Sequence, residues 1–225
     1  MRLRKVKHAE TLIAKNPLWV ITNPVCFRGQ WQSVFPDKRP IHLEVGSGKG
    51  KFILEMATTF PNINFIALEK QDSVLIRALE KLLVNPKANV RLILGHAKEV
   101  HQFFAPGEIM TIYLNFSDPW PKRRQEKRRL THPEYLARYR DILGTHGKLI
   151  LKTDNDRFFS YSLMQINGDD HFRIDRMSLD LEQTSWFNVP TEFEERFRSQ
   201  GNPIYYLEAT LIKGDSHERT LSGTR

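Results

Sequence analysis

An aspartate, a tryptophan and a block of positive charge stand together in the stretch NFSDPWPKRRQEKRR (115–129). Asp118 and Trp120 come directly before residues 122–129, of which six of eight are Lys or Arg. A carboxylate can orient a polar substrate, an indole face can stack on a base, and a basic run can follow a phosphate backbone. The alternatives are a core position for Trp120 and a solvated surface for the charged run.

Two prolines restrict the backbone around the tryptophan. Pro119 and Pro121 flank Trp120, which predicts a stiff turn. The preceding apolar run, 110–116, has the pattern of a strand. In an open α/β sheet, ligands bind at the carboxyl ends of the strands, near the point where the strand order reverses. We therefore expect Asp118 to face the reactive end of a bound cofactor.

A glycine-rich turn follows the first strand, in the segment LEVGSGKG (43–50). Gly46, Gly48 and Gly50 would let the backbone approach a ligand closely. Their spacing fits neither the dinucleotide fingerprint nor the P-loop. It suits a nucleoside ligand without a pyrophosphate, and S-adenosylmethionine fits, with Glu44 accepting hydrogen bonds from its ammonium group. A tight turn with no ligand is the alternative.

Two further strand ends carry polar residues. Glu69 ends the strand 64–70, where a carboxylate can accept hydrogen bonds from both hydroxyls of a ribose. His96 follows the strand 89–94, where the adenine would lie. A neutral imidazole can accept one hydrogen bond there, or the backbone of His96 can serve instead. An exposed glutamate and a solvated histidine are the alternatives.

Apolar periodicity predicts strands and helices that alternate from residue 41 onward. We expect strands at 41–46, 64–70, 89–94, 110–116, 148–154, 172–181 and 203–212, and helices at 49–60, 72–85, 132–143, 156–166 and 191–201. Such alternation predicts an α/β, Rossmann-like fold with a seven-stranded, mostly parallel sheet and helices on both faces. The last two strands lack a full crossover helix, so one edge is expected to be antiparallel. We expect a basic N-terminal arm at 1–40, the main domain at 41–213 and a flexible tail at 214–225.

The composition narrows the class of protein. A net charge of +8 and a pI of about 9.6 favour a polyanionic partner, with nucleic acid first. The single cysteine, Cys26, allows no internal disulfide and favours a reducing compartment. No apolar run approaches the roughly 20 residues of a membrane span. We predict a cytoplasmic protein with no membrane contact and no metal ion.

Together these motifs resemble the bacterial tRNA (guanine-N7)-methyltransferases, which methylate a guanosine in the variable loop of tRNA. The resemblance extends from Ile41 to Ile212 and rests on LEVGSGKG, ALEK, NFSDPWPKRRQEKRR, LKTDN and TEFEERF. It implies a class I S-adenosylmethionine-dependent methyltransferase that forms 7-methylguanosine in tRNA. The family includes monomers and homodimers, and the length and the FSDPW spelling of this chain favour a homodimer.

The resemblance also assigns roles to individual residues. The cofactor would be held by Glu44, Gly46, Gly48, Glu69, His96 and Asp118, and Asp118 would be the catalytic residue. The substrate site would contain Lys122, Asp154, Thr191, Glu192, Phe193 and Glu194. The RNA contacts would be Arg124, Gln125, Glu126, Lys127, Arg128 and Arg129. His96 departs from the family, which usually has Asp at this position.

Some roles have competing interpretations. Asp118 could read the guanine, steady the charge on the methylated purine, or do both, and Glu192 or Glu194 could read the guanine instead. Asp154 could cap the helix 156–166, and Thr191 with Glu194 has the spacing of a capping box. Two rival functions remain: an RNA methyltransferase acting on an exocyclic amine, which would use a similar acid-Pro-Pro-aromatic turn, and a non-catalytic RNA-binding protein on the same fold.

Overall fold

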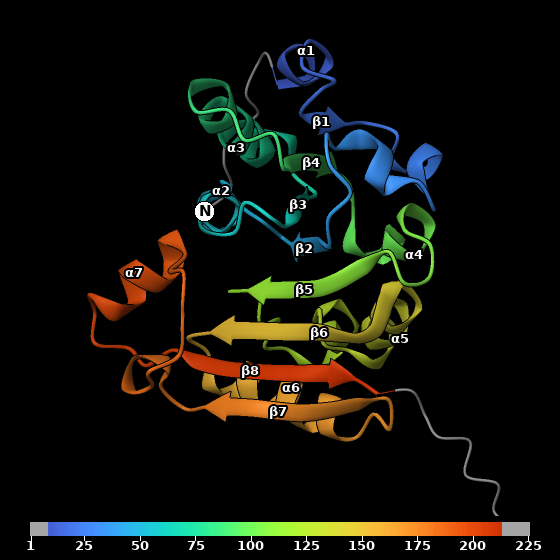
Figure 1. The fold of residues 1–225 in the computed structure, drawn as a ribbon. Helices are drawn as coiled ribbons and strands as arrows, with labels where there is room; N and C mark the ends of the chain where they lie inside the picture. Colours follow the sequence, from blue (N-terminus) through green and yellow to red (C-terminus); the bar gives the residue numbers. More distant parts are fainter. Residues whose placement is uncertain (1–8, 213–225) are drawn as a thin grey trace, which may run out of the picture.

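An eight-stranded β-sheet runs through the part of the chain that the computed structural model describes, residues 9–212 (Figure 1). Its strand order is β1-β4-β3-β2-β5-β6-β8-β7. The strands are β1 (Val20–Ile21), β2 (Ile41–Val45), β3 (Asn64–Glu69), β4 (Val90–Leu94), β5 (Ile109–Asn115), β6 (Leu143–Thr153), β7 (Phe172–Ser178) and β8 (Tyr205–Leu211).

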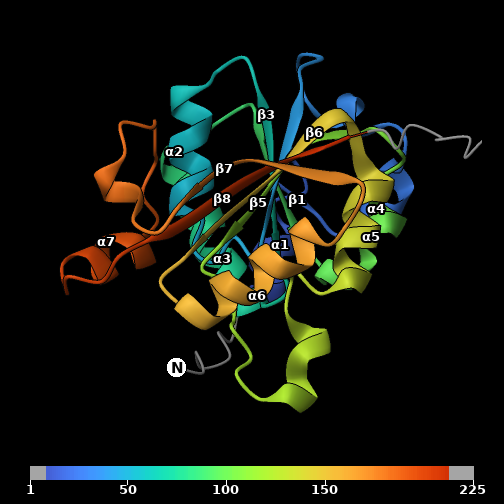
Figure 2. The ribbon, with the colours of Figure 1, turned by 90° about the horizontal axis from the view of Figure 1, so that it is seen from below.

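Helices cover both faces of the sheet, as predicted. They are α1 (Ala9–Ala14), α2 (Lys51–Thr59), α3 (Asp72–Val84), α4 (Val100–Phe103), α5 (Pro133–Ile142), α6 (Asp156–Asn167) and α7 (Glu192–Arg198). One apolar cluster contains residues of α1, α2 and α3, and a second contains residues of α4, α5 and α6. Figure 2 shows α2 and α5 on opposite sides of the strands. The sheet therefore has a separate core on each face.

The predicted count of seven strands is wrong by one. The additional strand, β1, pairs in parallel with β4 and comes from the segment expected to be an arm. Two residues are too short for a periodic pattern, so the sequence carries no local signal for this strand. Trp31 is fully buried in the same segment, and its indole N–H donates to the Phe103 carbonyl at 2.7 Å. Within the described chain, much of the segment before β2 is thus packed against the sheet.

The expected antiparallel strand is present, but it does not lie at the edge. β8 runs antiparallel to both of its neighbours, β6 and β7. β6 and β7 are therefore parallel to each other, and α6 joins them. A crossover of this kind carries the chain over one face of the sheet. The crossover leaves a gap between β6 and β7, which β8 fills. β7 therefore forms the edge of the sheet.

The strand ends hold the predicted motifs. β2 lies between β3 and β5, so the strand order reverses there. The glycine turn follows β2, and Glu69, His96 and Asp118 lie at or after the ends of β3, β4 and β5. The basic run after β5 forms a 3₁₀ helix, η4 (Arg123–Arg128). Among the helices of residues 9–212, none has the length and apolar character of a membrane span.

Candidate functional site

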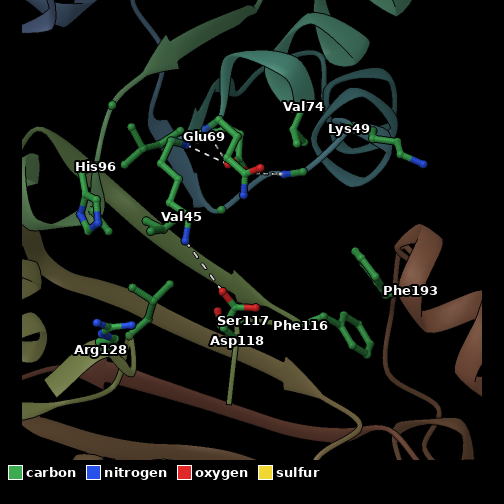
Figure 3. A pocket seen from close by; sticks show the side chains of 18 of the residues that line it. Val45, Lys49, Glu69, Val74, His96, Phe116, Ser117, Asp118, Arg128 and Phe193 are labelled. Atoms are coloured by element: carbon green, nitrogen blue, oxygen red, sulfur yellow. Dashed lines mark hydrogen bonds and ion pairs between the residues drawn. The ribbon is translucent and has the colours of Figure 1, made fainter. Parts of the chain in front are cut away.

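A cavity of about 810 Å³ opens where the carboxyl ends of β2, β3, β4 and β5 meet (Figure 3). It brings together many of the predicted site residues, namely Gly46, Gly48, Glu69, His96, Asp118, Glu192 and Phe193. Trp120 and Arg128 from the turn and the basic run also line it. Glu44, Lys122, Asp154, Thr191 and Glu194 are not among the residues that line this cavity. The four strand ends therefore converge on one site that faces the basic segment.

The glycine turn bends at three positions that favour glycine. Gly46, Gly48 and Gly50 have φ angles of 81°, 57° and 75°, a region that other residues rarely adopt. A Cβ atom on Gly50 would lie 2.6 Å from the Cβ of Ala78 in α3. Among the described residues other than the glycine and its two chain neighbours, no atom lies within 4 Å of a Cβ built on Gly46 or Gly48. Gly50 thus allows α2 to pack on α3, whereas Gly46 and Gly48 leave open space at the cavity.

Glu69 fastens the turn to the end of β3. Its carboxylate accepts from the backbone N–H groups of Gly48 at 3.2 Å, Lys70 at 2.9 Å and Gln71 at 3.0 Å. Burial raises the pKa of Glu69, and these hydrogen bonds act in the opposite direction. A carboxylate has about four acceptor sites, so Glu69 retains capacity for a ligand hydroxyl group.

Glu44 is buried with one carboxylate oxygen unsatisfied. Its Oε1 atom accepts from the Asn115 side chain at 2.9 Å, while Oε2 has no hydrogen-bond partner among the described residues. Burial raises the pKa of Glu44 to about 8, although Asn115 and Lys152 both oppose the shift. An unpaired buried acceptor costs roughly 1–3 kcal/mol. A cationic donor such as an ammonium group would remove that cost.

The His96 ring already uses its acceptor atom. Nδ1 accepts from the backbone N–H of Lys98 at 3.1 Å, and the His96 N–H donates to the Glu99 carboxylate at 3.1 Å. These bonds cap a short 3₁₀ helix, η3 (Ala97–Glu99). Burial, together with Lys70 and Lys98, lowers the pKa of His96, which favours the neutral ring. The remaining ring nitrogen, Nε2, is then a hydrogen-bond donor rather than the acceptor expected for the adenine amino group.

Asp118 stands on a strained turn at the cavity. Its side chain is 67% exposed and faces Lys70 across 3.8 Å (Figure 3). Phe116 and Trp120, on either side of it, have φ angles of 50° and 42°, a left-handed conformation that is rare for bulky residues. Such backbone strain persists where the surrounding structure holds it, often at functional sites. Asp118 is therefore an accessible carboxylate on a rigid support.

Comparison with known proteins decides the family. The model of a family described as "Putative methyltransferase" matches residues 38–207. The tRNA (guanine-N(7)-)-methyltransferase of Geobacillus thermodenitrificans (strain NG80-2) is 50% identical over 210 residues, covering 93% of this chain and 97% of that protein. The protein of the same name from Streptococcus pyogenes serotype M6 (strain ATCC BAA-946 / MGAS10394) is 46% identical over 212 residues, covering 94% and 100%. The chain belongs to the tRNA (guanine-N7)-methyltransferase family.

Solved structures of more distant proteins share the fold. The 16S rRNA methyltransferase KamB superposes with a TM-score of 0.60 at 13% identity, over 82% of this chain and 94% of that chain. SMU.1697c of Streptococcus mutans, a putative methyltransferase by its title and solved in complex with SAH, gives a TM-score of 0.53 at 16% identity, over 85% and 99%. At such identities the likeness shows the fold alone. It confirms the predicted Rossmann-like, class I methyltransferase fold.

The family's basic run is largely exposed beside the cavity. Lys122, Arg124, Lys127 and Arg128 are exposed, whereas Gln125, Glu126 and Arg129 are half-buried. The Arg128 guanidinium lies 4.9 Å from the centre of the Trp120 ring and covers an indole face that was expected to stack on a base. The six predicted RNA contacts therefore do not form one uniform surface.

α7 forms one wall of the cavity and presents only part of the predicted substrate segment to it. Glu192 and Phe193 line the cavity. Thr191 caps the helix, because its hydroxyl accepts from the Glu194 N–H at 2.9 Å. The reciprocal half of the predicted capping box is absent, because the Glu194 carboxylate bonds to other residues. Glu194 is fully buried and pairs with Lys152 at 2.8 Å and with Arg198 at 3.0 Å. The Glu194 carboxylate is thus engaged inside the protein.

Asp154 lies after β6 and is half-buried, and burial raises its pKa. The alternative role as a helix cap is wrong for this residue. Asn155 caps α6 instead, with its side-chain oxygen accepting from the Phe158 N–H at 2.8 Å. The substrate role of Asp154 stays a prediction, and Asp154 does not line the cavity.

Sequence reasoning missed several residues that shape the site. Asn115 binds Glu44, Lys70 faces Asp118, and Lys152 pairs with Glu194. Lys152 had a signal, since a lysine inside the apolar run KLILKTD predicts a buried charge with a partner. The sequence does not show which residue each of the three contacts, because all three partners are distant in sequence.

Proposed function

We propose that this protein is an S-adenosylmethionine-dependent methyltransferase that forms 7-methylguanosine in the variable loop of tRNA. The proposal rests on one cavity in a chain of this family. In that cavity the glycine turn and Glu69 lie opposite Asp118 and beside exposed arginines. The glycine turn suits a nucleoside cofactor, and the arginines suit a polyanionic substrate. The proposed tRNA substrate is in keeping with a cytoplasmic protein.

The residues present fit the cofactor. The unpaired Oε2 of buried Glu44 suits the ammonium group, and the open space at Gly46 and Gly48 suits the amino-acid part. Glu69 lines the cavity and would accept from the ribose hydroxyls, while the His96 ring would donate to an adenine nitrogen. When bound, the cofactor supplies a methyl group already activated by its sulfonium.

The proposed reaction needs no general base, because guanine N7 has an in-plane lone pair and carries no proton. The protein's contribution is alignment of the reacting atoms. The exposed Asp118 carboxylate can accept from the guanine N1–H and the exocyclic amine together, which would select guanine over adenine. It can also balance the positive charge that develops on the purine. Glu192 is the alternative reader, although Lys49 and Lys81 already pair with it at 3.5 and 2.8 Å.

The test is transfer of a labelled methyl group from S-adenosylmethionine to bulk tRNA, followed by nucleoside analysis. Labelled 7-methylguanosine, and chain cleavage by chemistry specific for that nucleoside, are the expected results. Label on an exocyclic amine would indicate the first rival function. Cofactor and tRNA binding without any transfer would indicate the second.

The oligomeric state is a separate proposal. The resemblance favours a homodimer, and light scattering of the purified protein tests it. A mass close to 26.4 kDa, the mass of one chain, would contradict it.

A further inference from the structure

Arg129 is bonded to the turn that carries Asp118. Its Nε atom lies 3.2 Å from the Pro119 carbonyl and 3.3 Å from the Trp120 carbonyl, and its Nη2 atom donates to the Trp120 carbonyl at 3.1 Å. The guanidinium also packs over the Tyr161 ring of α6, 4.3 Å from its centre. Arg129 therefore connects the backbone of residues 118–121, the catalytic turn, to a helix of the core.

The neighbouring Arg128 is placed differently. Its side chain is exposed and lines the cavity (Figure 3). The Arg128 guanidinium also contacts the face of the Trp120 ring. Among the described residues, no hydrogen bond or ion pair holds its guanidinium. Two adjacent arginines thus contact the same turn. Arg129 binds the backbone carbonyls of the turn, and Arg128 contacts the Trp120 ring from the side of the cavity.

The catalytic turn requires an external support. Trp120 has a φ of 42°, and a bulky residue keeps that conformation only where surrounding contacts hold it. Pro119 and Pro121 have no backbone N–H, so they cannot donate hydrogen bonds within the turn. The carbonyls of Pro119 and Trp120 are, however, available as acceptors. The planar fork of an arginine can bond two such carbonyls in a fixed geometry, whereas a lysine is a single point charge.

We propose that Arg129 is a positioning residue for the methyl transfer and not an RNA phosphate contact. It holds the catalytic turn so that Asp118 stays at the cavity, while the exposed Arg128 contacts the phosphates of the substrate. This inference rests on the proposed function. It separates the end of the basic run into a part that binds RNA and a part that supports catalysis.

The test compares Arg129→Ala, Arg129→Lys and Arg128→Ala with the wild type. Three quantities are measured: kcat with saturating cofactor and tRNA, the Kd for tRNA over a series of salt concentrations, and the Tm. We expect both Arg129 variants to lose about 100-fold in kcat, the size of effect that a misplacement of about 1 Å produces. Their Kd and salt slope should match those of the wild type. Arg128→Ala should raise the Kd and reduce the salt slope by about 1.

Arg129→Lys decides the matter if Arg129→Ala fails to fold, since it keeps the positive charge. A low kcat in Arg129→Lys with an unchanged Tm and Kd supports positioning. A restored kcat, or a reduced salt slope in Arg129→Ala like that of Arg128→Ala, would overturn the inference. A wild type that makes no 7-methylguanosine in the same assay would instead overturn the proposed function.

Discussion

Lys152 at the end of β6 and Glu194 on α7 form an ion pair of 2.8 Å in which both side chains are buried. The Lys152 ammonium also donates to the Asn188 side chain at 2.9 Å and to the Val189 carbonyl at 2.8 Å. One lysine thus fastens both α7 and the segment before it to the sheet. Because α7 supplies Glu192 and Phe193 to the cavity, this pair fixes one wall of the site.

Removing the lysine should destabilise the protein strongly. We expect Lys152→Met to lower the free energy of unfolding by about 3 kcal/mol, the lower end of the cost of breaking a buried ion pair, because Arg198 still pairs with Glu194. Urea denaturation followed by circular dichroism measures the loss. The control is Arg77→Met, which breaks the exposed pair with Glu80 and should cost no more than about 1 kcal/mol. Equal losses in the two variants would contradict the role of the buried pair.

Asp118→Ala should abolish most of the methyl transfer. We expect kcat to fall by about 100-fold or more, the size of effect seen when one electrostatic contact of a transition state is removed. The side chain is largely exposed, so the Tm and the Kd for tRNA should stay close to those of the wild type. Labelled methyl transfer and filter binding measure the two properties. Near-normal turnover would exclude Asp118 from catalysis.

Cofactor binding should release a proton from Glu44. The pKa of the buried carboxyl is about 8 in the free protein, so Glu44 is largely protonated at pH 7. An ammonium ligand favours the ionised form, so affinity should rise as the pH increases toward the pKa. Calorimetry in two buffers with different ionisation enthalpies measures the released proton. Glu44→Gln should abolish the release, and identical heats in both buffers for the wild type would contradict the prediction.

The same carboxyl makes a pH-dependent contribution to folding. Its pKa is raised from 4.5 in the unfolded chain to about 8 in the folded protein. The folded state therefore binds more protons between these values, and this contribution to stability falls as the pH rises from 4.5 toward 8. Denaturation at several pH values should show a smaller fall in Glu44→Gln. An identical pH dependence in both proteins would contradict this assignment.

Gly50→Ala should destabilise the junction of α2 and α3. The change combines left-handed backbone strain of roughly 1–2 kcal/mol with a steric clash against Ala78 of roughly 1–3 kcal/mol. Gly201→Ala is the matched control, because Gly201 has the same φ of 75° but open space around its Cβ position. Thermal unfolding measures both variants. Equal losses would show that strain alone acts at Gly50.

The parts of the fold that depend on local patterns could be predicted from the sequence. The alternation of strands and helices predicted a sheet covered by helices on both faces. The positions of Glu69 and Asp118 at strand ends predicted that both would lie at one cavity. The position of β8 could not be predicted, because pairing between β6 and β8 depends on contacts about 60 residues apart. The strand β1 was missed because two residues show no periodicity.

The residue types of the site could be predicted from the sequence, but the contacts of these residues with other parts of the protein could not. Glu194 and Arg129 belong to motifs that suggest substrate binding, yet both side chains hold other parts of the protein in place. A charged side chain can bind a ligand or a neighbouring segment, and only its burial and partners separate the two roles. His96 shows the same limit, since its acceptor atom caps η3.

The place of β8 between β6 and β7 affects how the chain completes its sheet during synthesis. β7 leaves the ribosome before β8, and β8 is its sole neighbour in the described sheet. Residues 172–178 therefore have no strand to pair with until residues 205–211 have emerged. Until then, the outer edge of β6 and both edges of β7 offer unpaired backbone groups to other chains. Nascent chains stalled between these two strands are expected to aggregate, because only insertion of β8 pairs the outer edge of β6 and the inner edge of β7 at once.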